Sequence, residues 1–352
     1  MPRTLQLLPL LAAGLAAGVL ACSPIGGRGG PARAGAVQPE AARGVSPAGP
    51  RAAPGEGRRV PLADIADTLF WRILHAGQYD SIPRAMLLLK AAYLQNPRDA
   101  RTTAHIGFLH AWSGTERARL ASVPPTITDH VILARTFFAR AAALDPADAR
   151  VQGFHAAFEM SDAAVQRDDA AFAAGLTRAR AAIAAWPEFN WFTVGYTLSG
   201  GDHASPLFRE GLAMQWQTMD ACSRTRIDRT NPTAAVALRA EATEQDPRRR
   251  RACWNSWIAP HNVEGFFLNM GDMLVKSGDW RTGVRVYALA QGMSSYPQWA
   301  FRDVLEARIA RAEQNVAAFR RPDADGPGRA EESPGPRIML RSRFACVACH
   351  QQ

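Results

Sequence analysis

The sequence predicts an all-α protein made of stacked helical hairpins. From residue 61 to residue 319 it is rich in Ala, Leu and Arg, apolar residues recur at helical spacing, and runs of β-branched residues are few. A second observation is a set of small and large apolar residues that returns at fixed spacing in this segment. Helical arrays have such periods, with small residues where two helices touch.

The recurring set has offsets of 4, 3 and 5 residues and closes on a proline. Its copies, the last of them incomplete, are Ala85, Leu89, Ala92 and Pro97; Ala134, Phe138, Ala141 and Pro146; Gly175, Ala179, Ala182 and Pro187; and Gly283, Tyr287 and Ala290. These offsets resemble the tetratricopeptide repeat. In that family small residues let the two helices of a hairpin approach, an aromatic fills the gap, and proline ends the second helix. The resemblance implies a TPR-like α-solenoid over residues 61–320.

The first helix of each hairpin matches the family less evenly. Where the family has a Leu-Gly pair, this chain has Ile106-Gly107 and Met270-Gly271. Insertions are expected at Ser122–His130 and Asn190–Pro206, and Trp299–Phe319 is expected to be a closing helix over the last apolar face. Such scaffolds bind other proteins on a concave face, so the resemblance implies a protein partner, although the fold alone does not choose it.

Composition and motif content narrow the function classes. Hydrophobic residues make up 47% of the 352 and charged residues 21%, which is typical of a globular domain and not of a polytopic membrane protein. The net charge of +9 includes +5 from residues 1–60, where 7 Arg face only Glu40 and Glu56, so it does not predict nucleic-acid binding. The chain has no phosphate-cradling glycine loop and no serine elbow, so a nucleotide-dependent or hydrolytic enzyme has no support.

Residues 1–21 are typical of an export signal. Arg3 precedes an apolar stretch that is too short and too interrupted by glycine to span a membrane comfortably. The Val-Leu-Ala sequence before Cys22 resembles the lipobox of bacterial lipoproteins, which implies cleavage after Ala21 and lipidation of Cys22. An ordinary signal peptide cleaved near Ala21 is the alternative. The resemblance implies a periplasmic or cell-envelope protein anchored to a membrane by lipid, and Ser23 favours the outer membrane in a host with two.

Residues 22–60 are expected to form a disordered tether. In residues 23–60, Gly, Pro and Ala account for 23 of 38 positions, and large apolar side chains are almost absent. Such a segment cannot bury enough surface to offset the entropy of ordering it.

The other four cysteines form two pairs. Cys222 and Cys253 lie in the helical segment, and Cys346 and Cys349 lie near the C-terminus. In an exported protein a disulfide between Cys222 and Cys253 is favoured, with two buried free thiols as the alternative.

A second Pro- and Gly-rich linker, residues 321–337, separates the body from a tail, residues 338–352, which is expected to be a flexible arm. The tail contains Cys346-Val347-Ala348-Cys349-His350, the attachment motif of c-type haem. Two thiols at this spacing can add to the two vinyl groups of one haem, and the adjacent histidine can reach the iron as an axial ligand. The motif therefore predicts one covalent haem c on Cys346 and Cys349, with His350 as an iron ligand.

Three alternatives use the same residues. A thioredoxin-like pair places its Cys-x-x-Cys at a helix start in an α/β fold, whereas only three residues follow Cys349 here. A zinc site needs further ligands, and adjacent Cys349 and His350 make shared tetrahedral coordination awkward. An unreacted thiol pair is the third alternative.

The chain printed here has two residues after His350, so the tail alone cannot enclose a haem as the cytochrome c family does. Three arrangements of such a haem are possible. It could dock on the helical body, a partner protein could cover it, or it could stay exposed with an open sixth coordination position. Candidate sixth ligands are Met339, the nearest thioether, and His261, which follows a tryptophan pair at an expected helix start. The structural alternative is that these tryptophans fill a hairpin core and that Asn262 caps the next helix. The arginines of Arg248–Arg251 form either a solvated face or a docking patch for an acidic redox partner.

Three functions fit this sequence. The first is electron transfer by the covalent haem with a redox protein held on the repeat surface. The second is a structural or assembly lipoprotein that binds proteins through its repeats, with the haem incidental or a sensor. The third is a haem enzyme with an open sixth position. A binding or electron-transfer role is expected ahead of an enzymatic one, with no nucleic acid or nucleotide as partner.

Overall fold

The computed structural model describes residues 59–233, 244–321 and 336–352. Helices and 3-10 turns are the only regular secondary structure in these ranges, so the all-α prediction is confirmed for them. The expected signal, Cys22 and nearly all of the expected tether lie outside the described residues, as do residues 322–335 of the expected linker. No helix in the described ranges is both long and apolar enough to cross a membrane.

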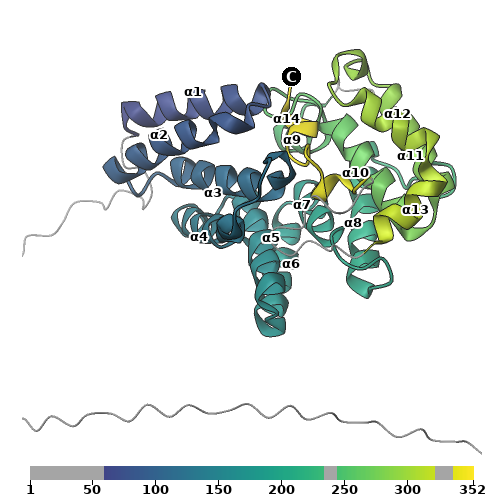
Figure 1. Cartoon of the computed structure of the whole chain (residues 1–352), viewed down its shortest axis with the longest axis horizontal. Helices are drawn as coiled ribbons and strands as arrows, with labels where there is room; N and C mark the ends of the chain where they lie inside the picture. The colour runs from purple at the N-terminus through teal and green to yellow at the C-terminus, as the bar shows by residue number, and fades with distance from the viewer. Residues whose placement is uncertain (1–58, 234–243, 322–335) are drawn as a thin grey trace, which may run out of the picture. The chain divides into compact units, whose positions relative to one another are not determined.

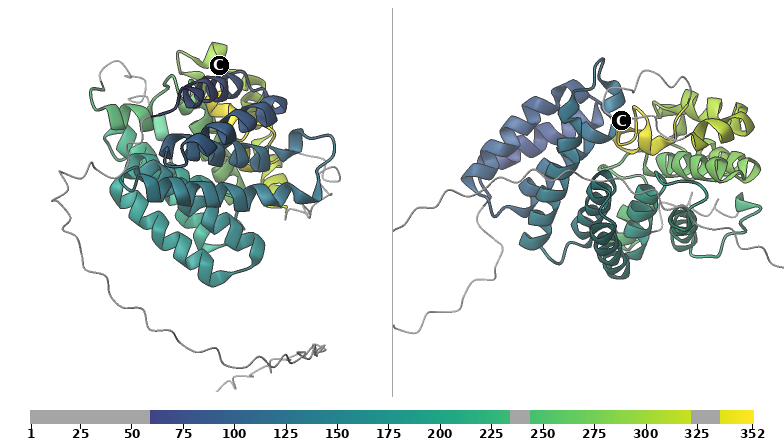
Figure 2. Two further views of the ribbon diagram at one scale, coloured as in Figure 1. Left: turned by 90° about the vertical axis from the view of Figure 1, so that its left-hand side faces the viewer. Right: turned by 60° about the horizontal axis from the view of Figure 1, so that its bottom comes forward.

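Most of the helices pack as sequential pairs, and neighbouring pairs pack on one another (Figures 1 and 2). The five larger pairs are α1 (Pro61–His75) with α2 (Ile82–Gln95), α3 (Ala100–Thr115) with α4 (Asp129–Leu144), α5 (Ala149–Gln166) with α6 (Asp169–Ala185), α7 (Pro187–Leu198) with α8 (Pro206–Ser223), and α10 (Asn262–Ser277) with α11 (Trp280–Gln291). This pairing is consistent with an α-helical repeat array.

Short polar side chains cap the start of six helices. The side chain of the residue before the helix accepts a hydrogen bond from a first-turn backbone N–H, which satisfies a donor that has no partner inside the helix. The caps of this kind are Asp99, Asp148, Asp168, Ser205, Asp246 and Asp279. Proline occupies the first helical position of α1, α7 and α8, where its missing N–H costs nothing.

The recurring small and aromatic positions lie where the helices of a pair touch. Phe138 of α4 packs on Gly107 of α3, where an added Cβ would lie 3.0 Å from the Phe138 ring. Tyr287 of α11 packs on Gly271 of α10 in the same way. The absence of a side chain at each glycine therefore lets the aromatic ring fill the space between the two helices, as the sequence spacing suggests.

Two local expectations were wrong. Residues 190–198 belong to α7 and are helical, so the connection to α8 is confined to residues 199–205. The expected single closing helix is a 3-10 turn (Tyr296–Gln298) followed by two short helices, α12 (Arg302–Ala310) and α13 (Ala312–Arg320). The helix breaks at Arg311, and each half buries an apolar side chain, Leu305 and Phe319.

The C-terminal tail is docked on the body and is not a free arm in its described part. It forms a 3-10 turn, Met339–Arg341, and a short helix, α14 (Val347–His350), which lies against both α1 and α10 (yellow in Figure 1). The expectation of a flexible arm failed because the tail carries apolar side chains that the body buries, including Ile338, Met339, Val347 and Ala348.

Cys222 and Cys253 are joined by a disulfide in the structure. It links the last turn of α8 to the end of α9 (Pro247–Cys253) across a sequence separation of 31 residues. The bond therefore ties the short helix α9 and the loop after it to the α7–α8 pair.

We expect the Cys222→Ala, Cys253→Ala double variant to lose about 3 to 4 kcal/mol of unfolding free energy, the loop-closure value for a loop of this length. Guanidinium unfolding without reductant measures this loss. Reduced wild-type protein should unfold close to the variant, and a variant midpoint equal to that of the oxidised protein would contradict the expectation.

Candidate functional site

Glu116, the residue that follows α3, has a buried carboxylate that holds the Cys346–His350 motif. Its Oε1 accepts hydrogen bonds from the backbone N–H groups of Cys346, at 2.7 Å, and Val347, at 3.0 Å. Its Oε2 accepts one from Nε1 of Trp112, at 2.8 Å, and lies 2.7 Å from Nε of Arg119. Glu116 has no accessible surface, and this burial raises the pKa of its carboxyl against the lowering effect of Arg119 and the N–H donors.

Elements far apart in the sequence bind the motif and the residues on either side of it. The Tyr196 hydroxyl of α7 donates to the carbonyl of Ala345 at 2.9 Å, and Nε1 of Trp299 donates to the carbonyl of Ala348 at 2.7 Å. The backbone N–H of His261 donates to the carbonyl of Cys349 at 3.0 Å. The backbone N–H of Gln352 donates to the carbonyl of His75, the last residue of α1, at 2.9 Å. The motif is thus fixed by contacts with α1, α3, α7 and α10.

His350 is oriented by a backbone carbonyl. Its Nδ1 lies 2.7 Å from the carbonyl oxygen of Ile258, and because a carbonyl only accepts, Nδ1 carries the proton. Nε2 is then the unprotonated nitrogen, and it makes no hydrogen bond with any part of the chain that the structure describes. Burial lowers the pKa of His350 to about 4, with smaller contributions from the charges of His75 and Arg251, so the ring is neutral at pH 7.

The two thiols differ in their surroundings. Cys349 is buried, and its Sγ lies against the backbone of Gly265 in α10, in space that a Cβ at this position would fill. Cys346 keeps some accessible surface. Burial raises the pKa of the Cys346 thiol well above its usual value, and raises that of Cys349 to about 12. Because a dithiol redox site needs a lowered thiol pKa, this environment disfavours the thioredoxin-like alternative.

Clustered metal-ligating side chains are not found among the described residues. No group of three or more His, Cys, Asp or Glu side chains with metal-binding geometry occurs within these ranges. A tetrahedral zinc site, which needs four such ligands, therefore has no support among these residues. A porphyrin brings its own four nitrogen ligands, so it requires only an axial donor such as Nε2 of His350.

Both expected sixth ligands are buried. The backbone N–H of Met339 donates to Oδ2 of Asp272 at 2.7 Å, and the Met339 side chain lies in the same apolar cluster as Cys349. A role for Met339 or His261 as an iron ligand stays a prediction.

His261 lies next to the motif. Its side chain is buried, and Nδ1 lies 3.5 Å from Oε1 of Glu264 but makes no hydrogen bond with the described residues. The expected cap on α10 is also different, since Asn255, and not Asn262, accepts the hydrogen bond from the Val263 N–H.

His75 is a neighbour that the sequence did not single out. Its Nε2 lies 3.3 Å from the carbonyl oxygen of Ile258, the same atom that Nδ1 of His350 contacts. Its ring centroid lies 5.6 Å from that of Trp71, one helical turn earlier, and 5.3 Å from that of Trp257. Trp71 and His75 are four residues apart and so lie on one face of α1, and this spacing is the sequence feature that could have identified the pair. Nothing in the sequence pointed to Glu116.

Two open pockets flank the docked tail. One, of about 820 Å³, is lined on its aromatic side by Trp71, His75 and Trp257, and reaches Gln352. The other, of about 660 Å³, is lined by Tyr79, Arg119 and Phe344 among others. Neither lining includes the two thiols of the motif.

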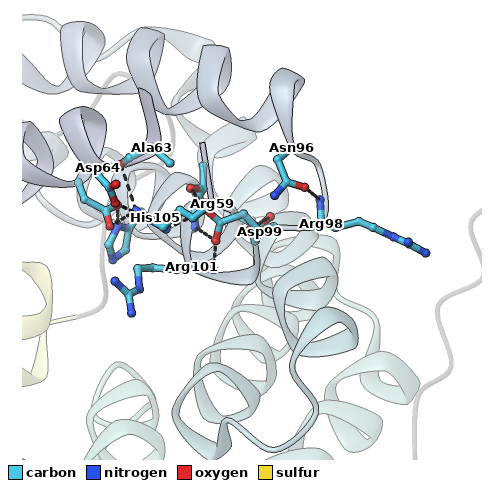
Figure 3. Close-up of polar contacts among 11 residues, drawn as sticks. Arg59, Ala63, Asp64, Asn96, Arg98, Asp99, Arg101 and His105 are labelled. Atoms are coloured by element: carbon cyan, nitrogen blue, oxygen red, sulfur yellow. Dashed lines mark hydrogen bonds and ion pairs between the residues drawn. The ribbon is translucent and has the colours of Figure 1, made fainter. Parts of the chain in front are cut away.

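The acidic edge of the larger pocket belongs to an ion-pair network (Figure 3). Arg59 bonds to Asp64 at 2.6 Å, to Asp99 at 2.8 Å and also to Asp67, and Asp67 lies 2.7 Å from Nδ1 of His105. Because these carboxylates already have cationic or N–H partners, the network is best explained as a structural tie between α1 and α3.

The arginines of α9 do not form one exposed patch. Nη2 of Arg248 donates to the carbonyl of Ala185, and Arg249 pairs with Glu188. Arg250 is exposed, whereas Arg249 and Arg251 are half-buried. The expected docking patch on these four arginines therefore has little geometric support.

Comparisons with protein-family models, curated proteins and solved structures found no match for this chain.

We expect Glu116→Ala to release the tail. The change leaves the N–H groups of Cys346 and Val347 without their acceptor and Arg119 without its carboxylate, although Arg119 still donates to the carbonyls of Gly77 and Arg343. Removing one member of a buried ion pair costs about 3 to 5 kcal/mol. Alkylation of Cys346 and Cys349, followed peptide by peptide with mass spectrometry, should become at least about tenfold faster.

The matched control is Glu210→Ala, which removes a partly exposed partner of Arg180 at 3.2 Å. Such surface pairs contribute only about 0 to 1 kcal/mol, so this variant should label at the wild-type rate. Equal labelling rates in both variants would show that Glu116 does not hold the tail.

Acid should destabilise the haem-free protein through His350. Its pKa is about 4 in the folded chain, against 6.5 for an unperturbed histidine, so between these pH values the unfolded chain binds a proton that the folded chain does not. This difference lowers the unfolding free energy by about 1.4 kcal/mol for each unit of falling pH in that window.

Urea unfolding at pH 7, 6 and 5 should therefore show a smaller loss of unfolding free energy per pH unit in His350→Gln than in wild type. His203→Gln, at a partly exposed histidine beside Asp202, is the control and should keep the wild-type slope. Identical slopes in all three proteins would refute the assignment.

Proposed function

We propose that this chain is an exported, TPR-like scaffold carrying one covalent c-type haem for electron transfer with a protein partner. The haem would be attached to Cys346 and Cys349 and ligated by His350. The observation that carries the proposal is the state of His350 within its Cys-x-x-Cys-His motif: Nδ1 is bound to the Ile258 carbonyl, and Nε2 is left free. Metal-binding histidines usually have their second nitrogen bound in this way.

The chemistry of the donor set fits a haem better than the alternatives. Attachment needs two thiols that each add across a vinyl C=C bond, sulfur bonding to one carbon and the thiol hydrogen going to the other, so that no oxidant or leaving group is required. Cys346 and Cys349 are free thiols, and Gly265 provides the room that the Cys349 sulfur occupies. When bound, the haem supplies reversible one-electron exchange with a redox protein.

The residues around the motif would orient and shield it. Glu116 sets the position of Cys346 and Val347, and Ile258 sets the His350 ring. The buried tail excludes water from the Cys349 side, and an apolar site that holds an imidazole ligand in one orientation avoids reorganisation when charge changes. These features support an electron carrier more than an enzyme with an open coordination site.

Export and anchoring belong to the same proposal. The disulfide between Cys222 and Cys253 is a bond typical of oxidising compartments, where c-type haem is also attached in bacteria. The Gly–aromatic contacts within the α3–α4 and α10–α11 pairs support the TPR-like assignment. We place the protein on the periplasmic or cell-envelope side, held by a lipid on Cys22, with a redox protein bound to the repeats.

The direct test is a covalent haem stain of the exported protein, produced with the bacterial haem-attachment machinery and separated under denaturing conditions. We expect a haem band in wild type and none in the Cys346→Ala, Cys349→Ala variant. The Cys222→Ala, Cys253→Ala variant is the matched control, since it loses the other cysteine pair and should keep the band. A wild-type protein without covalent haem would end the proposal.

A further inference from the structure

Arg251 is a half-buried cation without an anionic partner. Its Nε is inaccessible to solvent and makes no hydrogen bond, and none of the described carboxylates lies within ion-pair distance of its guanidinium. Its neighbour Arg249 contrasts with it, because that side chain pairs with Glu188 and Glu244. An unpaired charge that is partly removed from water is costly, so a position of this kind favours an anion.

The surroundings of Arg251 carry an excess of positive charge. Asp148, the carboxylate whose charge acts on Arg251, is already bound by Arg150, through Nε at 2.9 Å and Nη2 at 2.5 Å. Burial, together with the charge of Arg150, lowers the pKa of Arg251 to about 10. Asp148 is thus paired with Arg150, and the guanidinium of Arg251 remains uncompensated.

Arg251 also lies near the motif and is held in place. Ala252, the next residue, accepts a hydrogen bond from the side chain of Asn262, and the N–H of His261, which precedes Asn262, donates to the carbonyl of Cys349 in the motif. Two residues later, Cys253 is fixed to α8 by the disulfide, and the side chain of Asn262 donates to the carbonyls of Ala252 and Trp254. The position of Arg251 relative to α14 is thus set by the short helix and its cross-link.

We propose that Arg251 binds an ionised propionate carboxylate of the porphyrin held by the tail. This inference rests on the proposed function, because a haem attached through Cys346 and Cys349 and ligated by His350 brings two propionate groups with it. The planar guanidinium can bind a carboxylate through two parallel N–H donors, and the low-dielectric setting strengthens that pair. Arg251 is then a binding residue of the cofactor site and not part of a protein-docking patch.

The test uses reversible porphyrin binding by the full chain. In a Cys346→Ala, Cys349→Ala background, which prevents covalent attachment, the protein is titrated with haemin and with haemin dimethyl ester, whose carboxylates are blocked. Arg251→Gln should weaken haemin binding about 10- to 100-fold, the range for a lost charge-assisted hydrogen bond, and leave ester binding unchanged.

Arg251→Lys, which keeps the charge, should recover part of the lost haemin affinity. Arg250→Gln, the exposed neighbour on the same helix, is the matched control and should bind both porphyrins as the parent does.

The outcomes separate this inference from the proposed function. If Arg251→Gln binds haemin as tightly as the parent, or loses haemin and ester equally with unchanged circular dichroism, Arg251 does not bind a propionate, although the haem site stands. If the parent binds neither porphyrin and the wild type carries no covalent haem, both the proposed function and this inference are wrong.

Discussion

The docked state of the tail depends on one buried carboxylate. Glu116 is fully removed from water, which costs several kcal/mol for an isolated ion, and Arg119 together with three N–H donors offsets that cost. Because one of its oxygens binds the N–H groups of two consecutive residues, Cys346 and Val347, it fixes both the position and the direction of the turn that begins α14. The hydrogen bonds from Tyr196 and Trp299 join neutral groups, each worth about 1 kcal/mol, and add precision to a placement that the carboxylate sets.

A second constraint follows from that placement. Neutral histidine can carry its proton on either nitrogen, and the carbonyl of Ile258 selects Nδ1 in His350. Ile258 lies in the loop between α9 and α10, which is held by the disulfide at Cys253 and by Asn255, whose side chain binds Glu264 and Ser295. The disulfide is remote from the thiols of the motif in the sequence, yet it stabilises the segment that orients the histidine. The contacts that stabilise the body and the contact that orients His350 are therefore parts of the same arrangement.

The features that a local sequence pattern encodes could be predicted. The helical period, the small and aromatic positions such as Gly271 and Tyr287, and the pairing of Cys222 with Cys253 all follow from spacing or compartment. Features that depend on contacts between residues far apart in the sequence could not be predicted. Glu116 lies 230 residues before Cys346, and no periodicity marks a carboxylate that accepts backbone N–H groups from another element. The hydrogen bond from the Met339 N–H to Asp272, 67 residues earlier, has no local signal either. Docking of the tail was missed for the same reason, since its few apolar residues bury only because a complementary surface exists.

Burial also orders the steps of assembly that the proposed function requires. Thiol addition proceeds from accessible sulfur, whereas in the docked tail the Cys349 sulfur lies against Gly265, and burial raises the pKa of both thiols. An attachment enzyme must surround the five-residue motif, which four elements of the body already contact. If a haem is attached, its attachment would have to precede docking, with the tail undocked while the carbon–sulfur bonds form. Docking would then hold His350 on the Ile258 carbonyl, and Arg251 would be available to bind a carboxylate of the attached group.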